Sequence, residues 1–168
     1  MTGRGTRLQL LCAGALALAS APAMARDSLG MFETWGAFHD ATEPRCYAVA
    51  KAMPSTMQRD YQPYADVAIW PRRNVRNQIH FRLSRRLASG GRIVLNIGNQ
   101  RFELTGGGGD AWAADRRMDA GIVAAMRSAQ SMTVSARDAA GRGFSNTYPL
   151  AGAATAMGAA AIGCAAVR

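Results

Sequence analysis

The chain has 168 residues, which fits one domain with a hydrophobic core, and it carries a formal net charge of +9. Nearly all of its basic residues are arginines, because Lys51 is the only lysine. Its two histidines, His39 and His80, have no neighbouring cluster of cysteines and carboxylates in the sequence, so we expect no metal site and no cofactor.

Residues 1–25 have the pattern of a cleaved signal peptide. Arg4 and Arg7 precede an apolar stretch, LQLLCAGALALA, and the segment ends in the small-residue cleavage pattern AMA. The apolar stretch is too short for a transmembrane helix. We therefore expect a periplasmic or secreted protein in which residues 26–168 form a single domain and Cys12 is removed with the signal.

The remaining charge points to the kind of partner. Removal of residues 1–25 lowers the formal net charge from +9 to +7. In an exported protein, a basic surface favours anionic envelope components over nucleic acid, and the sequence shows no aromatic platform for stacking bases. We expect contact with the membrane to be peripheral at most.

Short segments with period-two alternation of apolar and polar residues predict β-strands. In NQIHFRLS, for example, Ile79, Phe81 and Leu83 alternate with polar residues. The predicted strands are, in chain order, 31–38, 45–50, 66–70, 77–84, 91–98, 99–105 and 131–138.

Turn-forming residues separate these strands. The segments SGG (89–91), GN (98–99) and AAGRG (139–143) all suit hairpins, because glycine and asparagine tolerate positive φ. The pattern predicts a mainly β fold, a single antiparallel β-sandwich or barrel-like domain.

Two segments have helical periodicity instead. In residues 115–130 one face collects apolar side chains, and Asp115 or Asp119 can cap the start: the face comprises Met118, Ile122, Ala125, Met126 and Ala129.

The second helix is predicted over residues 149–164. Its apolar stripe comprises Leu150, Ala153, Ala154, Met157, Ala161 and Cys164. Alanine and glycine give this stretch too little hydrophobicity for a membrane anchor, and three glycines weaken it as an isolated helix. We expect it to pack on the sheet.

Two cysteines, Cys46 and Cys164, remain after signal removal. An even pair in an exported chain favours a disulfide, which would tie the C-terminal helix to the sheet. Two free buried thiols are the alternative.

The order of these elements resembles the invasion associated locus B family of exported bacterial proteins. Members have a tryptophan-led opening strand, a cysteine-bearing second strand, a short helix running into a strand, and a closing L-x-G-x-x-x-A helix. The corresponding features here are Trp35, RCYAV, the segment DAGIVAAMRSAQ-SMTVSARD, and Leu150, Gly152 and Ala156.

The chain also departs from that family. Members often have a cysteine shortly after the opening tryptophan, where this chain has Phe38 and His39, and a mid-chain cysteine pair where it has TGGGGDAWAAD. The family's name records a link to host-cell invasion. The resemblance implies a periplasmic or surface protein without enzymatic activity.

The segment WPRRNVRNQIHFRLSRR is the strongest candidate for a binding site. Guanidinium groups bind phosphate and carboxylate in bidentate fashion, so this region could contact lipopolysaccharide or an acidic envelope protein. The alternative is a solvated face. Its arginines are Arg72, Arg73, Arg76, Arg82, Arg85 and Arg86.

Two alternative functions are also considered. A small periplasmic hydrolase would use His39 or His80, although G-x-S-x-G is absent and His80 is expected on an exposed strand face. An inhibitor or adaptor would act through the long loop Ala52–Asp66.

Two further features have structural interpretations beside the functional ones. TGGGGD (105–110) lacks the Gly-Lys-Ser/Thr of a phosphate loop, so a mobile loop or sharp crossover is expected. The aromatic residues could line a ligand groove or belong to the core or its rim; they are Tyr47, Tyr61, Tyr64, Trp70 and Trp112.

Overall fold

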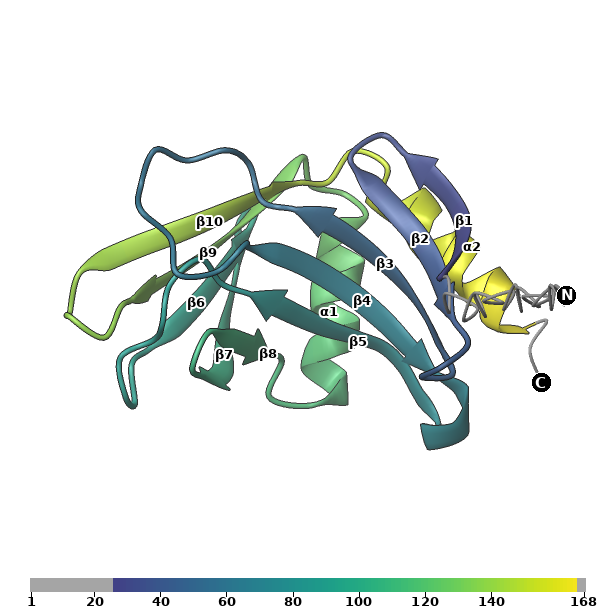
Figure 1. Ribbon diagram of the computed structural model, residues 1–168, viewed down its shortest axis with the longest axis horizontal. Helices are drawn as coiled ribbons and strands as arrows, with labels where there is room; N and C mark the ends of the chain where they lie inside the picture. The colour runs from purple at the N-terminus through teal and green to yellow at the C-terminus, as the bar shows by residue number, and fades with distance from the viewer. Residues whose placement is uncertain (1–25, 166–168) are drawn as a thin grey trace, which may run out of the picture.

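The computed structural model describes residues 26–165, which fold as one antiparallel sheet with two helices on it (Figure 1). The helices are α1 (Arg116–Met126) and α2 (Ala153–Ala165), and a 3-10 turn covers Pro71–Arg73. The strands are β1 (Asp27–Phe32), β2 (Trp35–Asp40), β3 (Arg45–Lys51), β4 (Tyr64–Trp70), β5 (Val75–Arg82), β6 (Ile93–Ile97), β7 (Gln100–Gly107), β8 (Asp110–Trp112), β9 (Ser131–Arg137) and β10 (Gly143–Pro149). The mainly β prediction is confirmed, and the predicted signal peptide lies outside the described residues.

The ten strands follow the order β1-β2-β3-β4-β5-β8-β7-β6-β9-β10. Strand β7 connects two halves of this sheet, because it pairs with β6 through Gln100–Leu104 and with β8 through Thr105–Gly107. The first half contains β1–β5 and β8, and the second half contains β6, β9 and β10. The two halves fold toward each other in a sandwich-like arrangement: the rings of Phe81 in β5 and Tyr148 in β10 lie 5.7 Å apart.

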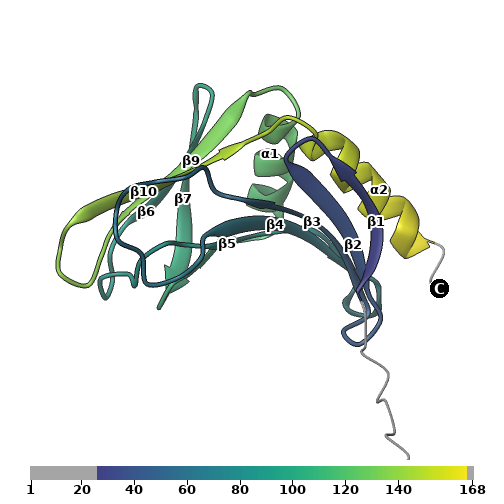
Figure 2. The ribbon, with the colours of Figure 1, turned by 45° about the horizontal axis from the view of Figure 1, so that its top comes forward.

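Both helices lie on the same side of the first half. Helix α2 packs on β1, β2 and β3, and α1 packs on β5 and on the adjoining β6 and β7. Strands β3, β4 and β5 pass in front of α1 in Figure 1, and Figure 2 shows the two helices together on one side of these strands. Within residues 26–165, no helix covers the opposite side of β2–β5.

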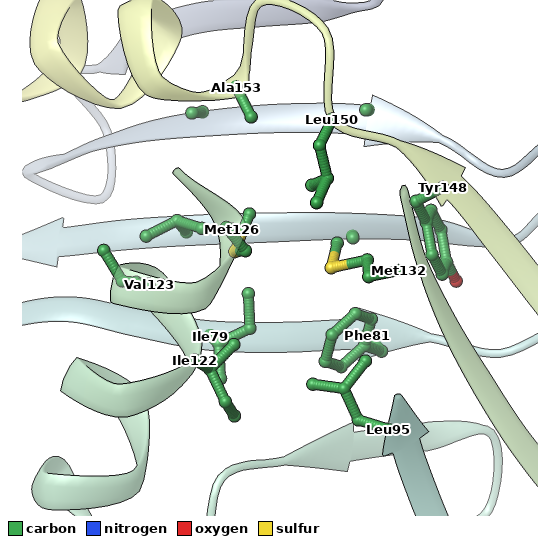
Figure 3. Close-up of a cluster of buried hydrophobic side chains, with 14 of the residues drawn as sticks. Ile79, Phe81, Leu95, Ile122, Val123, Met126, Met132, Tyr148, Leu150 and Ala153 are labelled. Carbon is green, nitrogen blue, oxygen red and sulfur yellow. The ribbon is translucent and has the colours of Figure 1, made fainter. Parts of the chain in front are cut away.

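The core fills the space between the helices and the two halves of the sheet (Figure 3). Ile79 and Phe81 of β5 face Ile122 of α1, and Leu95 and Tyr148 approach them from the second half. At the other end, Trp35 is fully buried, and its indole Nε1 donates a hydrogen bond to the carbonyl of Pro149 at 2.8 Å. That bond joins the start of β2 to the end of β10.

The sequence interpretation missed three strands. The single strand predicted over 31–38 is wrong, because the chain turns at Glu33-Thr34 and forms the β1–β2 hairpin there. Strands β8 and β10 were not predicted at all. Strand β8 spans only three residues after the glycine run, and the β10 sequence GFSNTYP has few large aliphatic residues. The glycines form a tight β7–β8 hairpin in place of the expected mobile loop or crossover, with Gly108 at a φ of +63°.

The turn predictions were right at two places out of three. Gly98-Asn99 joins β6 to β7, and the turn at Ala139–Gly143 joins β9 to β10. The expectation for Ser89–Gly91 was wrong, because the strands on either side of it pair with others: β5 with β4 and β8, and β6 with β7 and β9.

Of the two residues predicted to cap the start of helix α1, Asp115 is the one that does so. The Asp115 carboxylate accepts a hydrogen bond from the backbone N–H of Met118 at 2.7 Å, so Asp115 is the N-cap. Asp119 is buried and accepts the backbone N–H of Ile79 at 2.8 Å, which attaches the helix to β5. Burial raises the pKa of Asp119 above its ordinary value.

Helix α2 packs on the sheet as predicted, through a slightly different stripe. Ala154 and Ala161 are exposed; the buried residues of the helix are Ala153, Ala156, Met157, Ala160 and Cys164. Before the helix, Gly152 has a φ of +85°, and a Cβ there would lie 1.9 Å from the carbonyl oxygen of Phe32. Only glycine lets the chain turn from β10 into α2 this close to β1.

The predicted disulfide is present. It joins Cys46 of β3 to Cys164 near the end of α2, with Cα atoms 5.6 Å apart and a sequence separation of 118. None of the helices in residues 26–165 is long and apolar enough to span a bilayer.

We expect the double variant Cys46→Ala/Cys164→Ala to lose about 2–5 kcal/mol of unfolding free energy, because the cross-link constrains a long loop in the unfolded chain. Urea unfolding followed by tryptophan fluorescence measures the loss. Reduction of the wild-type protein should produce a similar loss, and an unchanged midpoint after reduction would contradict the stabilising role.

Candidate functional site

The side of β2–β5 turned away from the helices, here called the open face, carries the candidate site. Successive side chains along each strand point alternately to the core and to the open face. Trp35, Cys46 and Ile79 are among those that point to the core. The open face is presented by Gly36, Phe38, Arg45, Tyr47, Val49, Lys51, Tyr64, Asp66 and His80.

A groove of about 880 Å³ lies on the open face. Its floor is mainly apolar, with Phe38 and Tyr47 in the middle, and the loop that follows β3 forms one wall through Met53 and Pro54. This volume and this kind of lining are typical of small-molecule sites. Of the aromatic residues that the sequence assigned either to a ligand groove or to the core, Tyr47 and Tyr64 line the groove.

A column of alternating arginines and aromatic rings leads into the groove from the β4–β5 turn. The guanidinium of Arg73 lies 4.6 Å from the ring centre of Trp70, and that of Arg45 lies 5.0 Å from Trp70 and 4.7 Å from Tyr47. Phe38 then stacks on Tyr47 with ring centres 5.7 Å apart. Cation–π contacts of this kind hold the guanidinium groups in fixed positions.

The basic residues at the groove have different partners. The Nε atom of Arg45 lies 3.8 Å from the Glu43 carboxylate and makes no hydrogen bond, although it is buried. Arg26 lies 3.5 Å from Asp40. Lys51, at the other end of β3, forms no ion pair with any residue in 26–165. The lining thus carries positive charge at both ends of an apolar floor.

A row of paired polar side chains crosses β4, β5 and β8 beside the groove. The strand register places Asp66 opposite His80 and His80 opposite Trp112. The His80 Nδ1 atom lies 2.7 Å from the Asp66 carboxylate, and its Nε2 atom lies 3.1 Å from the Asp110 carboxylate. Asp110 also accepts a hydrogen bond from Arg82.

The expectation that His80 is exposed was wrong: its side chain is only 18% exposed, and its ring stacks on Trp112. Burial lowers the pKa of His80, but hydrogen bonds to Asp66 and Asp110 and their negative charges outweigh burial and raise this pKa above 6.5. Because carboxylates only accept hydrogen bonds, both ring nitrogens donate and the imidazolium form is favoured.

This geometry does not suit a general base. Both nitrogens of His80 are occupied by carboxylates, and the raised pKa favours the protonated ring over the neutral form that a general base requires. His39 lies 3.4 Å from Asp27 at the β1–β2 edge, and its hydrogen bonds within residues 26–165 include no serine, threonine or cysteine side chain. No group of three or more histidines, cysteines or acids in the same residues could hold a metal ion.

The six arginines singled out in the sequence do not form one cluster. Arg82 pairs with Asp110, and Arg85 contacts Asp138 at 2.9 Å, so both are held within the fold. Arg86 is exposed beyond the far end of β5. Arg72, Arg73 and Arg76 are exposed together at the β4–β5 turn; we call these three residues the arginine turn.

The long loop is shorter and more firmly held than predicted, because Tyr64–Asp66 belongs to β4. Its remaining residues make backbone hydrogen bonds at several points: Met53 donates to Thr147 at 2.8 Å and Asp60 donates to Ser84 at 2.8 Å. The loop therefore has a defined path, and its Met53, Pro54 and Gln62 line the groove.

Several residues of the site were missed by the sequence interpretation. Arg45, Val49 and Lys51 alternate with buried residues along RCYAVAK, so the period of two could have placed them on one face. The pairing of Asp66 and Asp110 with His80 has no counterpart in the local sequence pattern, because it depends on the order of β4, β5 and β8 in the sheet.

The chain matches no protein-family model, and comparison with characterised proteins and with solved structures gave no match. The resemblance to the invasion associated locus B family therefore stays a prediction, and functional inference depends on the geometry of the open face.

The His80 network predicts a pH dependence of stability. The stabilisation is fully present below the pKa of histidine in the unfolded chain, about 6.5, and is lost as pH rises through the higher folded-state pKa. Urea unfolding at pH values from about 6 to about 9 should show this decline in the wild-type protein and in a His39→Gln control, and no such decline in His80→Gln. A folded-state pKa of His80 at or below 6.5, measured by NMR, would contradict the network.

Proposed function

We propose that this protein is an exported, non-catalytic binding module of the bacterial envelope that contacts an anionic partner, lipopolysaccharide in the first place, through the arginine turn and Arg45. The observation that carries the proposal is the continuous arrangement Arg73–Trp70–Arg45, with cation–π distances of 4.6 and 5.0 Å. It connects the exposed arginine turn to the groove.

The chemistry of the arginine turn supports an anionic partner. Arg72, Arg73 and Arg76 form no ion pair with any acid in residues 26–165, in contrast to Arg82 and Arg85. Guanidinium forks bind phosphate oxygens in bidentate fashion, and stacking on Trp70 limits the side-chain entropy that Arg73 loses on binding. The positive charge of the whole chain adds long-range attraction to an anionic surface.

A role as an adaptor is the second candidate. Met53 and Met57 of the loop are 54% and 53% exposed, which suits contact with a protein partner. The loop's backbone bonds to Thr147 and Ser84 already fix its path, so a partner would meet a preformed surface there. An acidic envelope protein could alternatively occupy the arginine turn itself. The hydrolase alternative is disfavoured by the two carboxylates on His80.

The triple variant Arg72→Gln/Arg73→Gln/Arg76→Gln should bind vesicles containing lipopolysaccharide roughly 100-fold more weakly than the wild-type protein at low salt. Each basic residue near an anionic membrane surface contributes about 1 kcal/mol, and the contribution falls with added salt. Vesicle co-sedimentation at low and high salt measures both effects.

The matched control is Arg116→Gln/Arg117→Gln/Arg127→Gln, which removes three exposed arginines at the two ends of α1. It has the same net charge as the test variant, so it separates local contact from total charge. Equal weakening in both variants, or binding that is insensitive to salt, would count against the arginine turn as the contact.

A further inference from the structure

We propose that the groove on the open face holds the acyl chain of an anionic envelope lipid, whose head group lies at Arg45 and the arginine turn. This inference rests on the proposed function, since the head group is the anionic partner proposed above. It adds the class of ligand and the position of its apolar part.

The floor of the groove suits a hydrocarbon chain because it offers few hydrogen bonds. Strands β2, β3 and β4 are interior strands, each paired on both sides, so their backbone N–H and C=O groups are engaged in the sheet. A peptide or a sugar laid across this floor would leave its own polar groups without partners, at a substantial cost for each. An acyl chain carries no such groups.

Two of the polar side chains at the floor are also engaged with each other. Asp66 and His80 bond at 2.7 Å, and Thr34 at the rim donates to the carbonyl of Ala151 at 3.1 Å. The surface left for a ligand is mainly apolar and includes Phe38, Val49 and the ring of Tyr47. Burial of that surface against hydrocarbon is favourable in proportion to the area covered.

Flexible apolar side chains stand at the mouth of the groove. Met31 of β1 and Met53 of the loop are 66% and 54% exposed, and both line the groove. Methionine has an unbranched, polarizable side chain that adapts to irregular apolar ligands. Two such residues across the opening can close over a chain without displacing the backbone.

Charge complementarity gives the ligand its direction. The column that includes Arg73 and Arg45 ends on Tyr47 at the groove floor, so an anion on Arg45 has the apolar floor directly beyond it. Arg45, whose Nε is buried without a hydrogen bond, lies at this junction. From Arg45 to Lys51 the floor extends roughly 20 Å at the usual rise per residue of a strand, a span suited to a long chain.

The test uses hexyl, decyl and tetradecyl phosphate, which share one head group, below their micelle concentrations. Isothermal titration to protein purified from the periplasmic fraction should show affinity rising with chain length, up to about fourfold per methylene, until the groove is filled. Inorganic phosphate provides the reference without a chain.

Three variants locate the binding. Val49→Gln and Met31→Gln should abolish most of the chain-length dependence while leaving the weak binding of hexyl phosphate nearly unchanged. Arg45→Gln should weaken all three ligands by a similar factor. Ile162→Gln, at a 75% exposed position on α2, is the matched control and should behave as wild type. Met31→Gln changes an exposed side chain, so misfolding would not account for its effect.

Other outcomes overturn the inference. Affinity that does not depend on chain length, but is lost in Arg45→Gln, would show that the protein binds the anionic head group and that the groove does not hold the acyl chain. Chain-length dependence unaffected by Val49→Gln and Met31→Gln would place the chain elsewhere. A larger effect of Lys51→Gln than of Arg45→Gln would contradict the position of the head group.

Two controls address macromolecular occupants of the groove. Tighter binding of a peptide of alternating glutamate and leucine than of tetradecyl phosphate, lost in Val49→Gln, would assign the groove to a protein. Self-association that Val49→Gln abolishes would assign it to a second copy of the chain. Both results would refute the lipid, whereas failure of lipopolysaccharide vesicle binding would refute the proposed function itself.

Discussion

Every other side chain of β3 faces the helices, and this alternation governs the architecture on both sides of the sheet. Cys46, Ala48 and Ala50 point toward the helices, and the intervening side chains point to the opposite side of the same strand. A shift of one residue in the pairing of β3 would exchange the two sets, placing Arg45 in the core. The interior and the open face are therefore specified together, by one register.

Small side chains on the helix side make this arrangement possible. Ala48 in β3 and Ala156 and Ala160 in α2 are almost completely buried, which lets the helix approach the sheet closely. The disulfide from Cys46 to Cys164 holds an alanine- and glycine-rich helix that would be unstable alone. The large aromatic residues Tyr47 and Trp70 lie on the other side of the sheet from α1 and α2, where both contact the guanidinium of Arg45.

Local sequence patterns predicted most of the strands and helices but few of the residues of the candidate site. Period-two alternation in NQIHFRLS and helical spacing in α1 predicted their elements well, because each depends on near neighbours in sequence. The disulfide followed from counting two cysteines. In contrast, the split of the arginines into structural and exposed groups depends on Asp110 and Asp138, which are distant in sequence. The prediction that His80 is exposed was wrong for the same reason, because the order of β4, β5 and β8 in the sheet brings Asp66 and Asp110 beside it.

The proposed ligand surface is the open face, rather than the helix side. Methyl chemical shifts recorded by NMR during titration with an anionic lipid distinguish the two. We expect shifts at Val49, Met31 and Met53, which line the groove, and none at Ile162 on the exposed side of α2. Shifts centred on Ile162, with Val49 unchanged, would contradict it.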